Sequence, residues 1–401
     1  MKILILSQYF PPDITAAAFR VGETAEILAA RGHDLIIITA QPHKGKAEHR
    51  VVVSGFSEER FYRTKVLPIG SGGFRRYLQH YMSFFVGSVI QGMRCFLSYW
   101  KPDVLWVTSP PLFAGISGYC LAKLFSCRWV LDIRDIWPES AVAAGQISDR
   151  GIAYRLGKDL ERKLYNKADH LTCVSKPMSK YLQQNTPKPV TTLYNGVKAD
   201  YLLQTTHRGV HNRILYAGNL GLAQGLDVLM YAFLELKDQG DLSEWELILV
   251  GAGSYEKELR GIKARSSYGH NVRILPPMAK TEVLREMAYS RILFMNLKGD
   301  NVFKLTIPSK VFDYLLADRP ILAGLEGEGR EILVKTGGNI CFEPSNKEDL
   351  KEKLLYIIAH ISELEEKATY NSQYVKKHFP REKSVKKLES VFKQVTEKAN
   401  S

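Results

Sequence analysis

The chain opens with Lys2-Ile-Leu-Ile-Leu-Ser7 and Gln8-Tyr-Phe-Pro-Pro-Asp13, continues in a helical pattern to about Arg31, and after Gly32 reads Leu35-Ile-Ile-Ile-Thr39. Continuous apolar strands on either side of a helix are typical of a parallel sheet that is covered on both faces. The first apolar run breaks at Gln8, too early for the longer apolar region of a signal peptide. We therefore interpret this stretch as the first strand–helix–strand unit of a doubly wound α/β fold.

The same unit recurs through the rest of the sequence. Further strands are predicted at 104–108, 129–133, 171–174 and 191–194, and a second cycle of strands at 213–218, 246–251, 272–275, 292–295 and 320–323. A polar linker at 199–212 would separate an N-terminal domain, residues 1–200, from a C-terminal domain, residues 201–380, and a helix at 381–398 closes the chain. Two Rossmann-like sheets of this kind would face a central cleft at the carboxyl ends of their strands, where ligands bind in such folds.

Size and composition are those of a globular protein with two domains. A chain of 401 residues exceeds one ordinary core, and its 45% hydrophobic and 24% charged residues are usual for soluble proteins. The five cysteines are scattered and form no Cys-x-x-Cys pair. This pattern indicates reduced thiols in a cytoplasm and argues against a disulfide or zinc framework.

The net charge of +13 is placed unevenly along the chain. Residues 1–200 hold 26 Lys and Arg against 16 Asp and Glu, whereas residues 201–401 hold 29 against 26. A basic half beside a nearly neutral half suggests that one domain meets an anionic surface. The sequence contains no nucleic-acid motif and no dense basic run interleaved with aromatics, so a membrane surface or a phosphate-bearing substrate is favoured over nucleic acid.

Residues 74–100 combine basic and aromatic side chains around an apolar middle. Arg94 interrupts the longest apolar stretch, which makes the segment too broken to span a bilayer. One interpretation is an interfacial helix, with basic ends on headgroups and aromatic rings in the acyl boundary. The other is one or two core helices of the first domain. The basic charge of this half of the chain tips the balance slightly toward the membrane.

A run in the second half, Lys304-Leu-Thr-Ile-Pro-Ser-Lys-Val-Phe-Asp-Tyr-Leu-Leu-Ala-Asp-Arg-Pro320, gathers phosphate-binding features. Pro308 and Ser309 predict a helix start, with Ser309 able to cap free amides. Lys310 falls in the first turn, which attracts anions, and Asp313 follows one turn later on the same face. The pair suits a nucleotide diphosphate, with Lys310 on phosphate and Asp313 on ribose hydroxyls. A capped surface helix with an i,i+3 ion pair explains this run alone equally well.

Two glycine-rich turns follow predicted strands of the second domain. Residues 216–226, Tyr-Ala-Gly-Asn-Leu-Gly-Leu-Ala-Gln-Gly-Leu, end a strand and open a helix. Gly218 and Gly221 would let the backbone approach a phosphate closely. The second turn, Val250-Gly-Ala-Gly-Ser254, contains Gly251, and a simple tight turn is the better interpretation of that pattern alone.

Charged residues crowd the end of the strand predicted at 129–133. The run Leu131-Asp-Ile-Arg-Asp-Ile-Trp-Pro-Glu-Ser140 places Asp132, Arg134, Asp135 and Glu139 there. Buried charges are costly unless they are paired or used, which makes this loop a functional candidate. The alternative is a structural pair of Asp135 with Arg134, with Trp137 in the core.

Taken in order along the chain, the motifs resemble a known family. The ordered set is Ser-Gln-Tyr-Phe-Pro-Pro at 7–12, Asp-Ile-Arg-Asp-Ile-Trp-Pro-Glu-Ser at 132–140, Asn-Gly-Val at 195–197, Tyr-Ala-Gly-Asn-Leu-Gly-x-Ala-Gln-Gly at 216–225 and Pro-Ser-Lys-Val-Phe-Asp-Tyr at 308–314. It resembles the retaining family-4 glycosyltransferases of the GT-B fold, with the N-acetylfucosaminyltransferase-like enzymes of O-antigen and capsule assembly as the closest subgroup. The resemblance covers essentially the whole chain and implies that the C-terminal helix crosses back onto the first domain.

The resemblance implies a retaining transfer of a sugar, with N-acetylated amino and deoxyamino sugars among the candidates, from a nucleotide diphosphate sugar. The donor would be UDP-linked, and the acceptor a polyprenyl-diphosphate-linked glycan of bacterial surface polysaccharide synthesis. No cofactor and no metal are implied, because Lys310 and helix amides would offset the charge of the leaving diphosphate. The enzyme would be cytoplasmic and peripheral on the inner face of the cytoplasmic membrane. Sugar, acceptor glycan, linkage and oligomeric state stay open.

Several positions depart from the family pattern. They are Thr15-Ala-Ala-Ala18 in place of the usual Gly-Gly, Arg134 at the common catalytic-loop His, Asn219 and Gln224 where many relatives place an Arg and a Lys, and Leu305 for the first of two glutamates. Asp313 matches the second glutamate. Because two cations are missing, we expect Lys310 to carry more of the diphosphate charge than its counterpart in relatives.

The candidate site residues divide into three groups. Arg20, in the first helix, would point to the cleft, and Asn195 would form a hinge turn or contact ligand. The catalytic group is Asp135, Arg134 and Lys310; the donor group is Gly218, Asn219, Gly221, Gln224, Gly251, Ser309, Lys310 and Asp313; the acceptor group is Arg20, Asp132, Glu139 and Asn195; no residue is assigned to a metal.

Two other functions remain open on the sequence. A nucleotide-sugar epimerase uses a similar two-domain cleft, but it needs no lipid acceptor, and the basic first domain and residues 74–100 speak against it. A non-catalytic nucleotide-sugar-binding protein would keep the motifs of the second domain without needing the charged run at 132–139.

Overall fold

The computed structural model describes residues 1–43, 57–69, 74–198 and 210–397. The chain forms two compact units. The first unit comprises Met1–Asn195 together with Arg381–Ser401, and the second comprises Gly196–Pro380. The expected linker at 199–212 falls largely outside the described residues.

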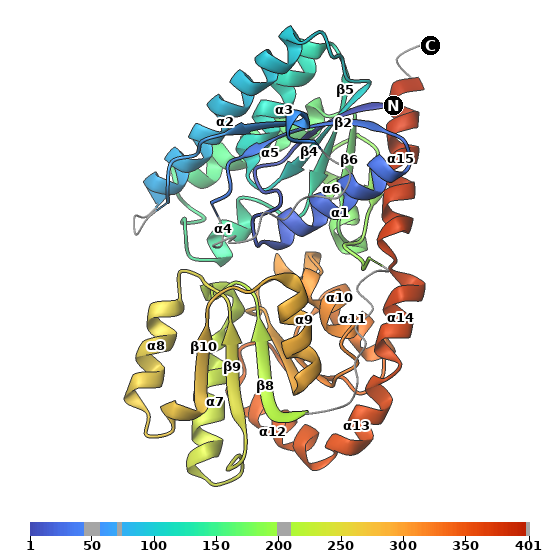
Figure 1. Cartoon of the computed structure of the whole chain (residues 1–401). Helices are drawn as coiled ribbons and strands as arrows, with labels where there is room; N and C mark the ends of the chain where they lie inside the picture. The colour runs from blue at the N-terminus through green and yellow to red at the C-terminus, as the bar shows by residue number, and fades with distance from the viewer. Residues whose placement is uncertain (44–56, 70–73, 199–209, 398–401) are drawn as a thin grey trace. The chain divides into compact units, whose positions relative to one another are not determined.

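Seven parallel strands form the sheet of the first unit (Figure 1). In spatial order they are β3 (Phe61–Thr64), β2 (Asp34–Ala40), β1 (Lys2–Leu6), β4 (Val104–Ser109), β5 (Arg128–Ile133), β6 (His170–Cys173) and β7 (Val190–Thr192). The central strands read as continuous apolar sequence because both faces are covered, and every residue of β4 is buried. The apolar pattern gives no signal for β3, a four-residue edge strand interrupted by Arg63.

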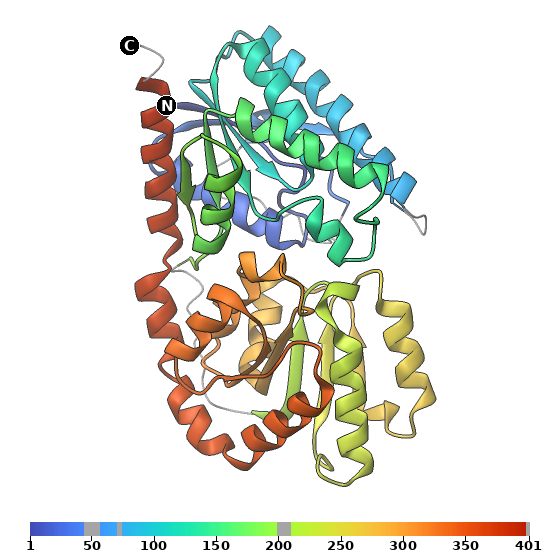
Figure 2. The ribbon, with the colours of Figure 1, turned by 180° about the vertical axis from the view of Figure 1, so that it is seen from behind.

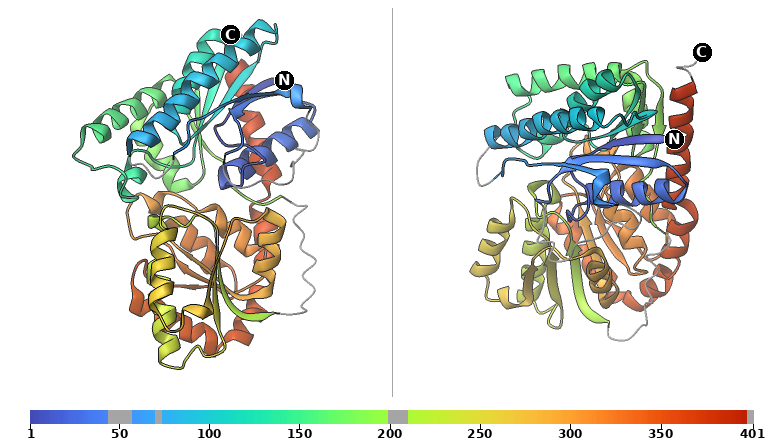
Figure 3. Two further views of the ribbon diagram at one scale, coloured as in Figure 1. Left: turned by 60° about the vertical axis from the view of Figure 1, so that its left-hand side comes forward. Right: turned by 45° about the horizontal axis from the view of Figure 1, so that its top comes forward.

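Helices cover both faces of this sheet (Figure 3). On one face, α3 (Leu112–Phe125) packs between α2 (Phe74–Leu97) and α5 (Ile152–Lys167). On the other face, α1 (Ala16–Ala30) packs against α15 (Arg381–Glu397). Two shorter helices, α4 (Glu139–Ala143) and α6 (Lys176–Asn185), follow β5 and β6.

The last helix of the chain completes the core of the first unit. Leu388 and Phe392 of α15 lie in one buried cluster with residues of α1, β1, β2 and β4. A buried ion pair joins Arg381 to Glu23 of α1 at 2.9 Å. The end of α15 lies beside the start of β1 (Figures 1 and 2). The first unit is therefore built from both ends of the sequence.

α2 is a single helix with two different sides. Its inner side buries Phe84 and Cys95 and packs on α3. Its outer side exposes an apolar stripe at helical spacing, consisting of Leu78, Met82, Val86, Ile90, Met93 and Leu97. The inner side agrees with a core helix, and the interfacial interpretation of 74–100 stays a prediction that concerns the outer side. Within the described residues, no helix combines the length and the apolar character needed to cross a membrane.

Six parallel strands form the sheet of the second unit. Their order is β10 (Val272–Leu275), β9 (Glu246–Val250), β8 (His211–Ala217), β11 (Ser290–Asn296), β12 (Ile321–Gly324) and β13 (Ile340–Cys341). Its helices are α7 (Leu226–Asp238), α8 (Glu256–Arg265), α9 (Lys280–Tyr289), α10 (Ser309–Leu315), α11 (Gly327–Lys335), α12 (Lys347–Ala359), α13 (Ile361–Ala368) and α14 (Asn371–His378). The two doubly wound parallel sheets confirm the predicted fold class.

Each sheet has a point where its strand order reverses. In the first unit the order runs outward in both directions from β1 and β4, and in the second from β8 and β11. The loops after these strands diverge at the carboxyl edge, which leaves room for a ligand in doubly wound sheets. Residues close to these two switch points are therefore the best placed to contact a ligand.

Candidate functional site

The loop after β8 begins the site of the second unit. Gly218 has a φ of +148°, and a Cβ built on it would lie 2.2 Å from Cε of Lys310. Gly251, at the end of β9, leaves room in the same way for the Gly218 carbonyl, which a Cβ would approach to 1.8 Å. The Gly218 amide donates to the Val250 carbonyl at 2.8 Å. Glycine is needed at both positions because the two strand ends and Lys310 meet there.

Lys310 lies at this edge and is held by a tyrosine. Its Nζ donates to the Tyr216 hydroxyl at 2.9 Å and lies 4.6 Å from the centroid of that ring. The hydroxyl in turn donates to the Asn219 carbonyl at 2.6 Å. Burial lowers the pKa of Lys310 to about 8, with Asp313 acting in the opposite direction. The ammonium is thus desolvated, yet it is still charged at neutral pH. A bound anion would stabilise this charged form.

The start of α10 differs in detail from the prediction. The helix begins at Ser309 as expected, but Pro308 occupies the N-cap position and no side chain caps the helix. Ser309 is therefore the first helical residue and not a cap. The expected i,i+3 pair also differs, since the Asp313 carboxylate pairs with Nζ of Lys280 at 3.3 Å. Asp313 remains half-exposed, so its oxygens are accessible from the same edge.

Two of the positions that depart from the family pattern, Asn219 and Gln224, are linked to each other. The Gln224 side-chain oxygen accepts from the Gly221 amide at 3.1 Å and lies 3.5 Å from Nδ2 of Asn219. These contacts fold the loop onto itself. At the switch point, buried Asn296 at the end of β11 donates to the Gln224 carbonyl at 3.0 Å and fixes the loop from the other side.

Tyr216 and Asn296 are functional candidates that the sequence analysis does not identify. Both lie at the ends of apolar strands, where a tyrosine or an asparagine reads as a core or turn residue. Their polar atoms gain a role only through partners 94 and 72 residues away. The phenol is neutral, because burial raises the pKa of Tyr216 well above its usual value.

In the first unit, Arg134 contacts the end of β4, one of the two strands at the switch point. It follows β5, and its amide donates to the carbonyl of Ser109 at the end of β4, at 3.0 Å. Its guanidinium reaches the Pro110 carbonyl at 3.4 Å, while its Nε is buried with no hydrogen-bond partner among the described residues. An unsatisfied guanidinium nitrogen costs free energy. The free Nε–H of Arg134 can therefore donate a hydrogen bond to a ligand at this edge.

Asp135 follows Arg134 in the same loop. Burial raises the pKa of its carboxyl group to about 6, against the opposing effects of a hydrogen bond from Ser140 and the charge of Arg134. A carboxylate with this pKa is ionised at neutral pH, yet it is a stronger base than an ordinary aspartate. The residue thus has the proton affinity that general-base work requires.

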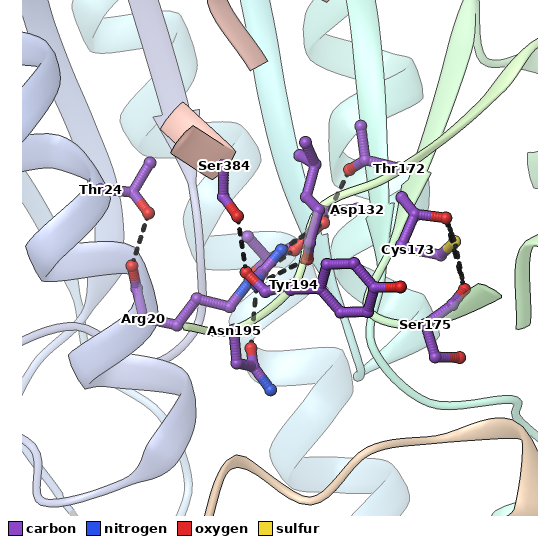
Figure 4. Close-up of polar contacts among 12 residues, drawn as sticks. Arg20, Thr24, Asp132, Thr172, Cys173, Ser175, Tyr194, Asn195 and Ser384 are labelled. Carbon is purple, nitrogen blue, oxygen red and sulfur yellow. Dashed lines mark hydrogen bonds and ion pairs between the residues drawn. The ribbon is translucent and has the colours of Figure 1, made fainter. Parts of the chain in front are cut away.

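Arg20 and Asp132 form a buried network in the scaffold below this edge (Figure 4). The Arg20 guanidinium donates to both Asp132 oxygens, at 3.1 and 3.3 Å, and Thr172 donates to the same carboxylate at 2.6 Å. Arg20 also donates to the Asn195 side-chain oxygen at 2.9 Å and to the Leu193 carbonyl at 3.2 Å. The sequence predicts that Arg20 and Asp132 contact ligand, whereas in the structure their buried charges pair with each other. They fix the position of Asn195.

Glu139, which the sequence analysis assigns to the acceptor group, forms an ion pair with a helix of the first unit. Its carboxylate accepts from Nζ of Lys158 on α5 at 2.7 Å, and that ammonium also binds Glu161 and the Tyr181 hydroxyl. The charge of Glu139 is thus partly satisfied by the helices behind the loop. Across the described residues, no group of three or more His, Cys, Asp or Glu side chains is placed to hold a metal ion.

Two family descriptions match the chain. "Glycosyl transferase 4-like domain" matches residues 15–196, and "Glycosyl transferases group 1" matches residues 211–360. Among curated proteins, the chain is similar to the putative colanic acid biosynthesis glycosyl transferase WcaI of Escherichia coli K12, with 26% identity over 265 residues. The match covers 60% of this chain and 64% of that one. The chain therefore spans about three fifths of the length of the curated relatives it matches.

Solved structures share the fold over the whole chain. The structure of Anabaena Alr3699/HepE in complex with UDP and glucose has a TM-score of 0.70 at 14% identity, covering 98% of this chain and 100% of that one. The sucrose-phosphate synthase of Thermosynechococcus elongatus has a TM-score of 0.74 at 14% identity, covering 100% of both chains. At this identity the likeness establishes the architecture.

Proposed function

Since the chain belongs to the family-4 glycosyltransferases of the GT-B fold, we propose that it transfers a sugar, with retention, from a UDP-sugar to a polyprenyl-diphosphate-linked glycan. The observation that carries the proposal is Lys310: a desolvated ammonium at the switch point of the second sheet, held by Tyr216 beside a glycine-rich loop. Among the described residues it has no carboxylate partner within 4 Å. Its charge is available to a leaving diphosphate, and Asp313 on the same helix would hold the ribose hydroxyls.

The first unit would bind the acceptor. Asp135 would orient or deprotonate the acceptor hydroxyl, because its carboxyl group has a raised pKa and follows β5 at the carboxyl edge of the sheet. Arg134 would hold an acceptor phosphate through its unsatisfied guanidinium. Asn195 would contact ligand from the end of β7, with Arg20 and Asp132 as its support.

The biological setting that we propose is bacterial surface polysaccharide assembly, with an N-acetylated amino or deoxyamino sugar as donor. The similarity to a protein named for colanic acid biosynthesis supports this setting. The resemblance of the ordered motifs to N-acetylfucosaminyltransferase-like enzymes supports the choice of sugar. The enzyme would act at the inner face of the cytoplasmic membrane.

One experiment separates this proposal from its alternatives. The protein is incubated with a panel of UDP-sugars, with and without a polyprenyl-diphosphate sugar, and the products are identified by mass spectrometry. Transfer requires the acceptor, whereas an epimerase converts the donor alone and a binding protein converts nothing. Donor conversion without acceptor, or binding without turnover across the panel, would overturn the proposal.

Asp313→Asn should weaken UDP binding by about tenfold, the scale of losing one charge-assisted hydrogen bond. The fold should be unaffected, because the ion pair that Asp313 makes with Lys280 is partly exposed and contributes little to stability. Titration calorimetry with UDP provides the measurement. Asp241→Asn, an exposed carboxylate elsewhere in the second unit, is the control. If the variant binds UDP with the affinity of the wild type, Asp313 does not bind the ribose.

The apolar stripe of α2 should attach the first unit to anionic lipid. Cations near such a surface contribute about 1 kcal/mol each, so sedimentation with anionic vesicles should be strong at low salt and fall steeply as salt is raised. Val86→Asp combined with Ile90→Asp should abolish it. Val334→Asp, which charges an exposed apolar position of the second unit, should not. If the wild type does not sediment with the vesicles at low salt, the lipid-binding prediction is wrong and α2 is only a core helix.

A further inference from the structure

We propose that the first unit carries a second phosphate-binding site at the amino ends of its strands, opposite the edge that holds Arg134 and Asp135. An open hollow of about 1520 Å³ lies there. Its lining includes Lys2, Lys101, Lys123, Lys167, Lys393 and Tyr119. We refer to it as the lysine hollow. The proposal does not rest on the transferase activity.

The position of the lysine hollow separates it from the proposed reaction site. Arg128, at the start of β5, lines the hollow, whereas Arg134 follows the end of the same strand. From Arg128 to Arg134 the extended chain rises ~3.3 Å per residue, which separates the two residues by about 20 Å. The end of α15 and the start of β1 lie side by side (Figures 1 and 2), and residues of both line the hollow. A ligand bound there would not contact the loops at the carboxyl edge.

The carboxylates around the hollow are mostly occupied by other partners. Asp103 accepts the backbone amide of Lys2 at 2.7 Å. Asp169 pairs with Arg128 at 2.9 Å and accepts the Trp129 amide at 3.0 Å. Within the described part of the chain, none of the five lysines has a carboxylate within 4 Å. The six basic side chains of the lining, the five lysines and Arg128, thus outnumber its four carboxylates, Asp34, Asp103, Asp169 and Glu397.

Ordinary structural roles explain only part of this charge. Lys123 and Lys167 lie in the last turns of α3 and α5, where cations favour the helix dipole. Both lie about 6 Å from the centroid of the Tyr119 ring, so one aromatic side chain sits between them. Lys2 begins β1, and Lys101 lies in the loop between α2 and β4, so neither is in the last turn of a helix. Like charges in excess of their counter-charges repel, and a bound anion would relieve that repulsion.

The charge of the whole protein points to the same unit. Residues 1–195 and 381–401 hold 31 Lys and Arg against 18 Asp and Glu, whereas residues 196–380 hold 24 of each. The formal charge of +13 is thus carried entirely by the first unit. Such a field raises the local concentration of anions and steers them to it.

The chemistry favours a phosphate ligand. Lysine ammoniums are compact point charges that suit phosphate oxygens, and several of them match a group with two or more negative charges. Cys127 also lines the hollow, and burial raises the pKa of its thiol to about 12, so the thiol stays neutral and adds no opposing charge. The ligand could be a soluble phosphate or diphosphate or a lipid headgroup phosphate, which share this chemistry.

Lysine footprinting tests the site residue by residue. The full-length protein is acetylated briefly with and without inorganic pyrophosphate, and each lysine is quantified by mass spectrometry. Pyrophosphate should slow acetylation of Lys101, Lys123 and Lys167 about threefold or more, as expected for groups held in charge-assisted contacts. Lys257 and Lys335, exposed lysines of the second unit, should be unaffected. Unchanged or uniformly reduced acetylation would overturn the proposal.

Two further arms identify the source of the phosphate and confirm the site. Vesicles of phosphatidylcholine, with or without phosphatidic acid, replace pyrophosphate in the footprint. Protection by pyrophosphate and by the anionic vesicles assigns a headgroup phosphate, and protection by pyrophosphate alone assigns a soluble ligand. Protection by vesicles alone would overturn the site, because it reports only surface charge. Lys101→Glu with Lys123→Glu should weaken pyrophosphate binding about tenfold or more relative to Lys257→Glu with Lys335→Glu. Equal affinities would contradict it.

Discussion

Replacing Lys310 with alanine is expected to lower kcat by about 100-fold or more, the scale for removing one positioned electrostatic stabiliser. The effect is large because Asn219 and Gln224 supply no charge to the diphosphate, and their side chains instead bind within their own loop. Burial lowers the pKa of Lys310 to about 8, so kcat/KM for the donor should decline as pH rises through about 8. Steady-state kinetics with the identified donor across this pH range gives both quantities.

Two variants separate the charge of Lys310 from the fold around it. Lys335→Ala removes an exposed lysine of the same unit and should leave kcat unchanged. Tyr216→Phe keeps the buried ring but removes the hydroxyl that joins Lys310 to the Asn219 carbonyl, so it should lower kcat less than the alanine variant does. Near-wild-type kinetics of a folded Lys310→Ala protein would eliminate the diphosphate role.

Asp135→Asn is expected to lose transfer by about 100- to 10,000-fold, the usual contribution of a general base. Burial raises the pKa of this carboxyl group to about 6. The wild type should therefore lose kcat/KM as pH falls through about 6, and this acidic limb should be missing from the residual activity of the variant. UDP affinity should be preserved, because the proposed donor contacts lie in the other unit.

Stability provides the control for Asp135. Its folded pKa is raised above the ordinary value of 3.8, so the folded state binds more protons than the unfolded state between about pH 4 and 6. The charged carboxylate therefore lowers stability as pH rises through this range. Asparagine removes that cost, and the variant should unfold at no lower temperature than the wild type at pH 7. A collapse of UDP affinity with high residual turnover would instead make the loop structural or donor-binding.

The sequence predicts the scaffold better than the contacts within it. Continuous apolar runs predict the central strands of both sheets. The edge strands β3 and β13 are not predicted, because such short strands carry little sequence pattern. The run at 132–139 correctly indicates buried charge. It cannot show that Asp132 forms an ion pair with Arg20, because the two residues are 112 positions apart in the sequence. A charge alone does not reveal whether its partner is protein or ligand.

The same limit applies to Ser309 and Tyr216. Ser309 fits a capping pattern, yet the helix starts one residue earlier than a cap would require, with Pro308 before it. Tyr216 sits in an apolar strand, and only the fold brings its hydroxyl to Lys310. Tertiary contacts of this kind override local propensity and local pattern.

The closing helix α15 also bears on how the protein is made. The buried cluster that unites α1 with β1 and β2 is complete only when Leu388 and Phe392 of α15 have joined it. At about 5–20 residues per second, a ribosome needs roughly 10 to 40 s to synthesise the second unit, Gly196–Pro380, before α15 follows. During that interval the first unit waits with part of its core open to water, while the second unit, encoded without interruption, can complete itself. The half of the protein that is synthesised first is therefore the half that finishes folding last.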